Sequence, residues 1–123
     1  MDLVGGHGTK HVYDGPKKTA DRILNPQPGD RIPTASTHTF SPDDADYLVK
    51  ETLRQNSNEI DFWFKTSMTN DTLKLVYTTG HNQPTGYGIL RNGTTFQPTY
   101  KMSVELSRTK HGYIIDKYYP SFK

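Results

Sequence analysis

The period of the hydrophobic pattern changes just past the middle of this chain, and that change constrains the fold more than any other feature. In the first half, Ala45, Leu48 and Val49 begin a run of apolar residues at three- and four-residue intervals, the spacing of one helix face. In the second half, segments such as 73–77 and 102–106 alternate between apolar and polar residues, as strands do. Helices followed by antiparallel strands predict an α+β fold.

Start and stop signals set the expected bounds of the elements. Ser41 and Pro42 are a cap and a first-position proline, so they predict the start of a helix. A loop is expected at 25–33, which is rich in proline, and Lys110-His111-Gly112 predicts the turn of a hairpin. Trp63 and Phe64 are expected to anchor the core. The predicted helices cover 17–24, 42–55 and about 60–64, and the predicted strands cover 73–77, 87–91, 102–106 and 113–115.

Length and composition narrow the class of protein. With 123 residues, the chain is expected to form one domain over residues 1–123. It has no cysteine, which excludes a disulfide framework and a thiolate metal site. No apolar run approaches the roughly 20 residues that span a bilayer, and the N-terminus lacks the features of a signal peptide. A net charge of +2 permits an anionic partner without requiring one.

The known motifs for metal or nucleotide chemistry are not found. His7 and His11 are four residues apart and would share one face of a helix, but no nearby carboxylate completes a ligand set. The chain has neither a glycine-rich phosphate loop nor a nucleophile elbow. We therefore expect no metal and no cofactor.

The remaining polar residue types suit metal-independent cleavage of RNA. That reaction needs a base for the ribose 2′-hydroxyl, an acid for the departing 5′-oxygen and cations for the phosphate. Histidine titrates near neutrality and suits the proton transfers. Arginine and lysine can hold the phosphate, and the 2′-hydroxyl is an internal nucleophile, so no metal is required. Composition alone does not single out this chemistry.

The order of several short motifs resembles that of the RNase A-like toxin domains of bacterial contact-dependent inhibition (CdiA C-terminal) and related polymorphic toxins. Arg22-Ile23 follows His11 by eleven residues, as an Arg-Leu pair does in that family. The other matching segments are Gly5-Gly6-His7 through His11-Val12, Ile32-Pro33-Thr34-Ala35-Ser36-Thr37, Asn56 to Trp63, Gly86-Tyr87-Gly88, Val104-Glu105-Leu106 and Gly112-Tyr113 to Tyr119-Pro120. The resemblance implies an RNase A-like α+β fold without disulfides, in which short helices precede a twisted antiparallel sheet.

The resemblance also implies roles for individual residues. His11 matches the catalytic histidine of the family, and Arg22 matches its catalytic arginine. The family uses a threonine and a tyrosine two residues apart near the C-terminus. In this chain the two positions fall on Lys117 and Tyr119, so a lysine replaces the threonine. A shift by one residue would select Asp116 and Tyr118 instead.

Other polar residues receive lesser roles. Ser36 and Thr37 are candidates for substrate binding or ordinary strand or turn hydroxyls. The two N-terminal histidines are four apart where the family usually has five, which leaves the role of His7 open. His38, His81 and His111 lie in expected loops or turns, and we interpret them as structural.

These features predict a metal-independent endoribonuclease toxin that leaves 2′,3′-cyclic phosphate ends and serves in competition between bacteria. We expect a monomer without a cofactor, with RNA and a cognate immunity protein as its partners and no membrane. It would be delivered as part of a larger secreted or surface toxin and act in the target-cell cytoplasm. A non-catalytic RNA- or protein-binding domain on the same scaffold is the alternative, and a barnase-like toxin fold, with a different strand order, is a third.

Overall fold

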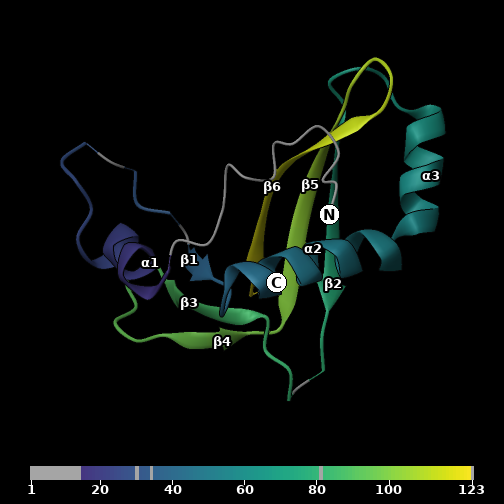
Figure 1. The fold of residues 1–123 in the computed structure, drawn as a ribbon. Coiled ribbons are helices and arrows are strands. Elements are labelled where there is room, and N and C mark those ends of the chain that lie inside the picture. The colour runs from purple at the N-terminus through teal and green to yellow at the C-terminus, as the bar shows by residue number, and fades with distance from the viewer. Residues whose placement is uncertain (1–14, 30, 34, 81, 123) are drawn as a thin grey trace.

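In the part of the chain that the structure describes, three helices and one short strand precede five further strands (Figure 1). The computed structural model describes residues 15–122 apart from positions 30, 34 and 81. The helices are α1 (Gly15–Leu24), α2 (Pro42–Gln55) and α3 (Ser57–Thr66). The strands are β1 (Ala35–His38), β2 (Thr72–Thr78), β3 (Gly86–Leu90), β4 (Gln97–Thr99), β5 (Lys101–Arg108) and β6 (Tyr113–Ser121).

The strands form two antiparallel sheets of three. One sheet has the order β1-β3-β4, and the other has the order β2-β5-β6. β6 also contacts β1 and β3, so this strand lies where the two sheets meet. In Figure 1, β6 runs down toward β1 and β3, and the two sheets are set at an angle to each other.

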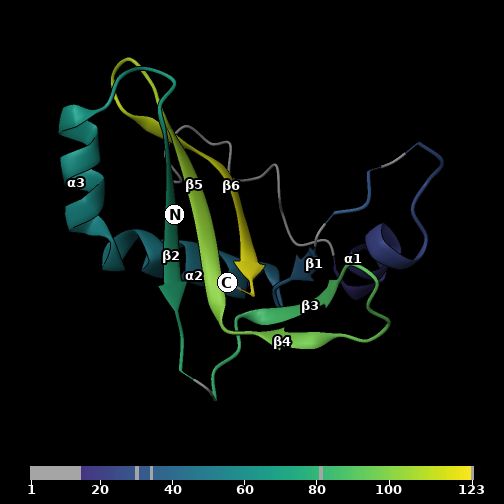
Figure 2. The same ribbon diagram turned by 180° about the vertical axis from the view of Figure 1, so that it is seen from behind.

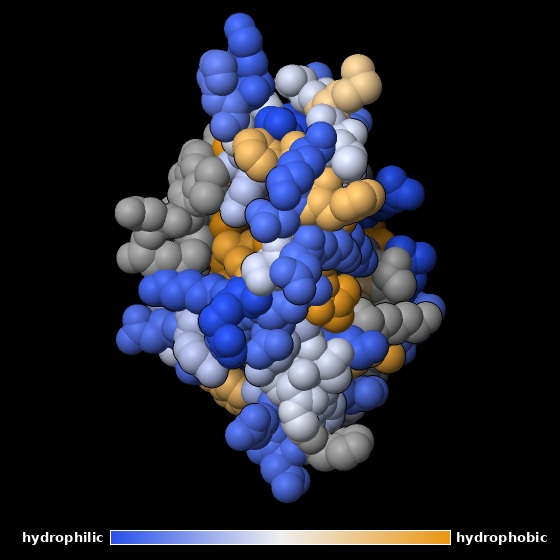
Figure 3. Space-filling view, turned by 90° about the vertical axis from the view of Figure 1, so that its right-hand side faces the viewer, coloured by the Kyte–Doolittle hydropathy of each residue, from blue (hydrophilic) through white to orange (hydrophobic). Residues whose placement is uncertain are grey.

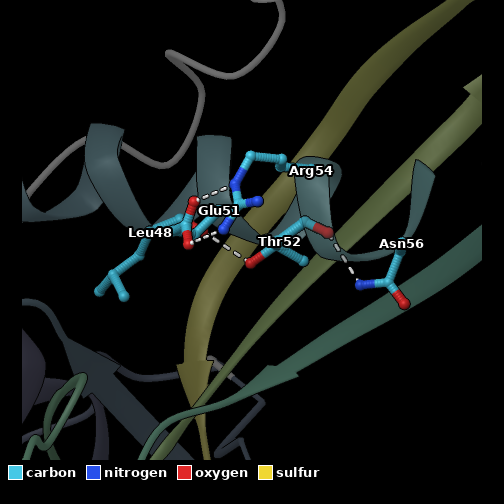
Figure 4. Close-up of polar contacts among 5 residues, drawn as sticks. All are labelled: Leu48, Glu51, Thr52, Arg54 and Asn56. Atoms are coloured by element: carbon cyan, nitrogen blue, oxygen red, sulfur yellow. Dashed lines mark hydrogen bonds and ion pairs between the residues drawn. The ribbon is translucent and has the colours of Figure 1, made fainter.

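α2 begins where its sequence predicts. The side chain of Ser41 accepts a hydrogen bond of 3.1 Å from the backbone N–H of Asp44, which satisfies one otherwise unpaired donor of the first turn. On the buried face, Thr52 Oγ1 donates to the carbonyl of Leu48 at 2.7 Å (Figure 4). The side chain of Asn56 donates to the carbonyl of Thr52 and so stabilises the last turn of the helix (Figure 4).

The main hydrophobic core lies between α2 and one face of the β2-β5-β6 sheet. α2 contacts both β2 and β5. The fully buried hydrophobic residues of β5 are Met102, Val104 and Leu106, which alternate along the strand and face the helix side. The other buried members of this core are Ala45, Leu48, Val49, Ile60, Trp63, Leu75, Ile115 and Tyr118.

Several expected elements differ in the structure. Residues 35–38 form a strand, so the prediction that His38 lies in a loop was wrong; this histidine is buried on β1. β4 was not expected, and β6 runs to Ser121 rather than ending at Ile115. Phe64 is not in the core: it is 37% exposed, and the guanidinium of Arg108 stacks on its ring at 4.2 Å.

The outer side of α3 carries exposed hydrophobic side chains. Phe62 is 70% exposed, and Met68, just after the helix, is 75% exposed. Figure 3 views the molecule from the side on which α3 lies in Figure 1, and hydrophobic side chains are interspersed there with hydrophilic ones. Within the described part of the chain, no helix is long and apolar enough to cross a membrane.

Candidate active site

α1 carries Arg22 on its last turn. Thr19 and Ile23 are buried and face the first sheet, because α1 contacts β1 and β3. Arg22 is exposed on the same turn, where a cation interacts favourably with the negative end of the helix. Beside it, hydrogen bonds from Asn25 and Lys17 lower the pKa of Asp21. The helix therefore carries Arg22 on an exposed turn while its other face packs on the first sheet.

β1 separates the two hydroxyl residues predicted to bind substrate. Ser36 pairs with Ile89 and is 3% exposed, and its Oγ has no hydrogen-bond partner. Thr37 pairs with Gly88 and is half-buried on the opposite face of the strand. Ser36 is thus a buried residue of the first sheet, whereas Thr37 is the more accessible of the two.

Arg91 fixes the segment that leads into β1. Its Nε donates to the carbonyl of Pro33 at 3.2 Å, and its Nη2 donates to the carbonyl of Ile32 at 2.8 Å. Arg91 directly follows β3, so these bonds hold the start of β1 against the end of its partner strand. Sequence analysis did not identify this role, because a bond between residues 58 positions apart leaves no local pattern.

His38 is held by its neighbours at the end of β1. Its Nδ1 lies 2.8 Å from the carbonyl oxygen of Thr39, and the ring of Phe96 meets the imidazole edge-on at 5.5 Å. Tyr87, the cross-strand partner of His38, lies 6.2 Å away between ring centroids. These contacts agree with a structural role for His38, although the expected loop is a strand.

The two sheets touch near Gly88. A Cβ atom at this position would lie 2.6 Å from Cγ2 of Thr37 and 3.0 Å from the ring of Phe122, so only glycine fits without displacement. Phe122 directly follows β6. Its ring therefore brings the end of β6 to the β1-β3 pair, on the face that carries Thr37.

β6 carries both candidate C-terminal pairs, Lys117 with Tyr119 and Asp116 with Tyr118, and their side chains lie in different surroundings. Tyr118 is 9% exposed and belongs to the core, and burial, together with the nearby carboxylate of Asp46, raises its pKa. Asp116 is the extra residue of a bulge opposite Glu105 and Leu106, and its carboxylate accepts a hydrogen bond from Ser107. A pair made of Asp116 and Tyr118 would not share an accessible face.

Lys117 and Tyr119 lie together on the face of the sheet opposite the core. Figure 2 is seen from this side, with α2 behind the sheet. Lys117 Nζ is 3.4 Å from Oε2 of its cross-strand partner Glu105. The ammonium of Lys74, on β2, lies 5.9 Å from the centroid of the Tyr119 ring. Below them, the hydroxyls of Ser103 and Ser121 are buried and 2.8 Å apart. Lysines, a tyrosine and the carboxylate of Glu105 therefore lie together on this face.

The elements that carry the predicted residues meet at the junction of the sheets. α1, with Arg22, packs on β1 and β3; β1 carries Ser36 and Thr37; β6, with the C-terminal pair, contacts β1 and β3. His11 and His7 lie outside the described residues, as does His81. No group of three or more histidine, aspartate or glutamate side chains within the described ranges could hold a metal ion.

Sequence analysis did not single out Lys74 or Glu105, which also lie on this face. Alternation with the buried Leu75 places Lys74 on the polar face of its strand. The alternation does not show which residue of another strand lies opposite, because register depends on turns and bulges between them. Strand pairing therefore had to come from the structure.

The fold and the arrangement of polar residues define a small α+β domain with a cationic sheet face and no disulfide. Residues 7–120 match the family model described as Bacterial CdiA-CT RNAse A domain. The chain belongs to this family of ribonuclease toxin domains of contact-dependent inhibition, and the expected RNase A-like fold is confirmed.

A solved structure shares this fold. The crystal structure of a CdiA-CT/CdiI complex from Y. kristensenii 33638 has a TM-score of 0.76 to this chain at 18% sequence identity. The likeness covers 95% of this chain and 99% of the other. The search of curated proteins found no match.

Proposed function

We propose that this domain is a metal-independent endoribonuclease that cleaves RNA by attack of the ribose 2′-hydroxyl on the adjacent phosphate. The products are a 2′,3′-cyclic phosphate and a 5′-hydroxyl. The observation that carries the proposal is the family match over residues 7–120. The position of Lys117 and Tyr119, on one accessible face of the strand that joins the two sheets, supports it.

In this mechanism the substrate supplies its own nucleophile. The 2′-hydroxyl lies next to the phosphorus, so the protein needs to align it and move protons. His11 takes the proton from the 2′-hydroxyl or returns one to the leaving 5′-oxygen. Arg22 and Lys117 stabilise the charge that develops on the phosphate oxygens. Tyr119 positions the phosphate or assists the proton transfer.

The two hydroxyl residues of β1 take different parts in the proposed site. Thr37 is half-buried on the face that Phe122 contacts, so its hydroxyl is the one that binds the substrate directly. Ser36 is buried, and its unpartnered Oγ lies beneath the strand. We therefore assign direct contact with RNA to Thr37 rather than to Ser36.

The family also points to a biological setting. We propose that the domain acts as the C-terminal toxin of a larger secreted or surface protein and cleaves RNA in the cytoplasm of the target cell. The structural neighbour is a CdiA-CT/CdiI complex. We infer that this domain likewise has a cognate immunity protein, and that it acts on RNA as a monomer.

Purified protein incubated with RNA in excess EDTA tests the activity. We expect cleavage in EDTA, cyclic-phosphate ends on the products, and loss of cleavage in His11→Ala. Full activity of His11→Ala, or intact RNA with the wild-type protein, would contradict the proposal. Salt-sensitive RNA binding without cleavage would instead identify a non-catalytic RNA-binding domain.

A further inference from the structure

Three charged residues form a row across the β2-β5-β6 sheet. Lys74 pairs with Glu105, and Glu105 pairs with Lys117. Directly paired residues of antiparallel strands project from the same face. The neighbours of Lys74 along β2, Leu73 and Leu75, face the core, so the row lies on the face that α2 leaves uncovered (Figure 2).

The two lysine side chains of this row extend toward neighbouring strands. Lys117 extends toward Glu105, with 3.4 Å between Nζ and Oε2. Lys74 extends diagonally past β5, so that its ammonium lies 5.9 Å from the centre of the Tyr119 ring on β6. An ammonium over a tyrosine face is attracted by the ring, which holds the Lys74 side chain in this direction.

Glu105 determines how anions can bind to this face. Its carboxylate lies between the two lysines in the strand register, and a phosphate bound midway between them would be repelled by it. The two ammonium groups are also held by different partners, that of Lys117 by the carboxylate of Glu105 and that of Lys74 by the ring of Tyr119. The row therefore suits two separate phosphates, one at each lysine, better than one phosphate shared by both.

We propose that Lys74 binds a phosphate of the RNA next to the one that is cleaved, so that the protein prefers oligonucleotides to dinucleotides. This inference rests on the proposed ribonuclease function, with Lys117 and Tyr119 at the scissile phosphate. The RNA strand then runs over β6 and β5, with the scissile phosphate at Lys117 and Tyr119 and the adjacent phosphate at the ammonium of Lys74. Lys74 is a specificity-determining residue in this arrangement and takes no part in proton transfer.

Binding to an uncleavable RNA tests the proposal without relying on activity. The probe is a 2′-O-methyl oligonucleotide of about ten nucleotides, within the range of single-strand site sizes. Full-length Lys74→Gln should bind it about fivefold more weakly than the wild type. The slope of log K against log salt should become shallower by about 0.7, because one phosphate contact is lost.

Lys65→Gln is the matched control, because Lys65 is an exposed lysine on α3 and its loss changes the net charge equally. It should leave both the affinity and the salt slope near their wild-type values. Equal weakening by the two variants would show a general charge effect and overturn the proposal. Wild-type affinity and slope in Lys74→Gln would also overturn it.

A comparison of a long and a short substrate shows whether Lys74 binds the adjacent phosphate or the scissile phosphate. Lys74→Gln should lower kcat/KM about fivefold on the all-RNA form of the oligonucleotide and leave it unchanged on a dinucleotide, which has a single phosphodiester. Equal losses on both substrates would place Lys74 at the scissile phosphate and contradict the proposal. If the wild-type protein cleaves neither, the proposed function fails, and the binding measurement still decides the role of Lys74.

Discussion

Two adjacent tyrosines of β6 show how much one position along a strand changes a residue's role. Tyr118 is buried in the core with α2, whereas Tyr119 lies on the other face beneath the ammonium of Lys74. Alternation along a strand is expected from sequence, but the bulge beside Asp116 shifts the register. The family's C-terminal pair could fall on this chain in two registers, and only one of them, Lys117 with Tyr119, gives two residues on an accessible face.

The buried phenol of Tyr118 predicts a loss of stability at high pH. Burial, reinforced by Asp46, raises the pKa of Tyr118 above its ordinary value near 10. Above that pH the unfolded chain releases the proton while the folded protein retains it, so the free energy of unfolding falls as pH rises. Urea unfolding of Tyr118→Phe between about pH 9 and 11 should show a smaller fall than the wild type.

Tyr47→Phe provides the control for this measurement, because it removes a hydroxyl from a side chain that is 60% exposed. This variant should keep the wild-type dependence on pH. An unchanged pH dependence in Tyr118→Phe would show that the Tyr118 phenol does not contribute to the alkaline loss of stability.

At the scale of elements, β1 was the main feature that sequence patterns did not predict. It has four residues, too few to show a convincing alternation, and it is bounded by a proline-rich loop and the cap of α2. Its stability comes from pairing with β3 rather than from its own sequence. α2 was predicted with its bounds because Ser41, Pro42 and the apolar spacing are local signals that agree with each other.

The contact between β1 and β3 predicts a strict requirement for glycine at position 86. A Cβ atom at Gly86 would lie 2.0 Å from the carbonyl oxygen of His38, which is backbone and cannot rotate away. Gly86→Ala must therefore move the two strands apart. We expect it to reduce the free energy of unfolding by about 3 kcal/mol or more, measured by urea unfolding.

Gly80→Ala is the comparison for this variant, since a Cβ there would meet no atom within 4 Å. It should change stability by less than about 1 kcal/mol, and the reduced freedom of the unfolded chain favours a small gain. If the two alanine variants unfold at the same urea concentration, the close approach of Gly86 to β1 does not limit stability.

At the scale of the whole molecule, the proposed site depends on how two sheets are joined. Arg22 and Thr37 belong to the first sheet and its helix, whereas Lys117 and Tyr119 belong to the second. Sequence motifs identified these residues one by one but not the junction, because the contact of Phe122 with Gly88 joins segments more than 30 residues apart. The prediction that these residues belong to one site came from the family resemblance and not from their spacing in the sequence.

The junction predicts an effect of Phe122 on activity as well as on stability. Phe122→Ala removes the ring that lies against Gly88 and should lower the free energy of unfolding by about 1–3 kcal/mol. Well below its melting temperature, the folded variant should also lose kcat/KM on RNA by about tenfold or more, because Thr37 is no longer held relative to β6.

Phe62→Ala removes the same side chain from an exposed position on α3, and it should keep both wild-type stability and activity. Thermal unfolding and RNA cleavage under one set of conditions compare the two variants. A Phe122→Ala protein that is destabilised but fully active when folded would show that the junction supports the fold without positioning the site.

β6 follows the other described strands in the sequence, so the ribosome synthesises it after them. This strand pairs with β5 and contacts β1 and β3, so these contacts between the two sheets form only after β6 has been synthesised. A nascent chain that has emerged as far as β5 has its helices and most of its strands but lacks Lys117 and Tyr119. Translation therefore adds the strand that carries Lys117 and Tyr119 after the other five described strands.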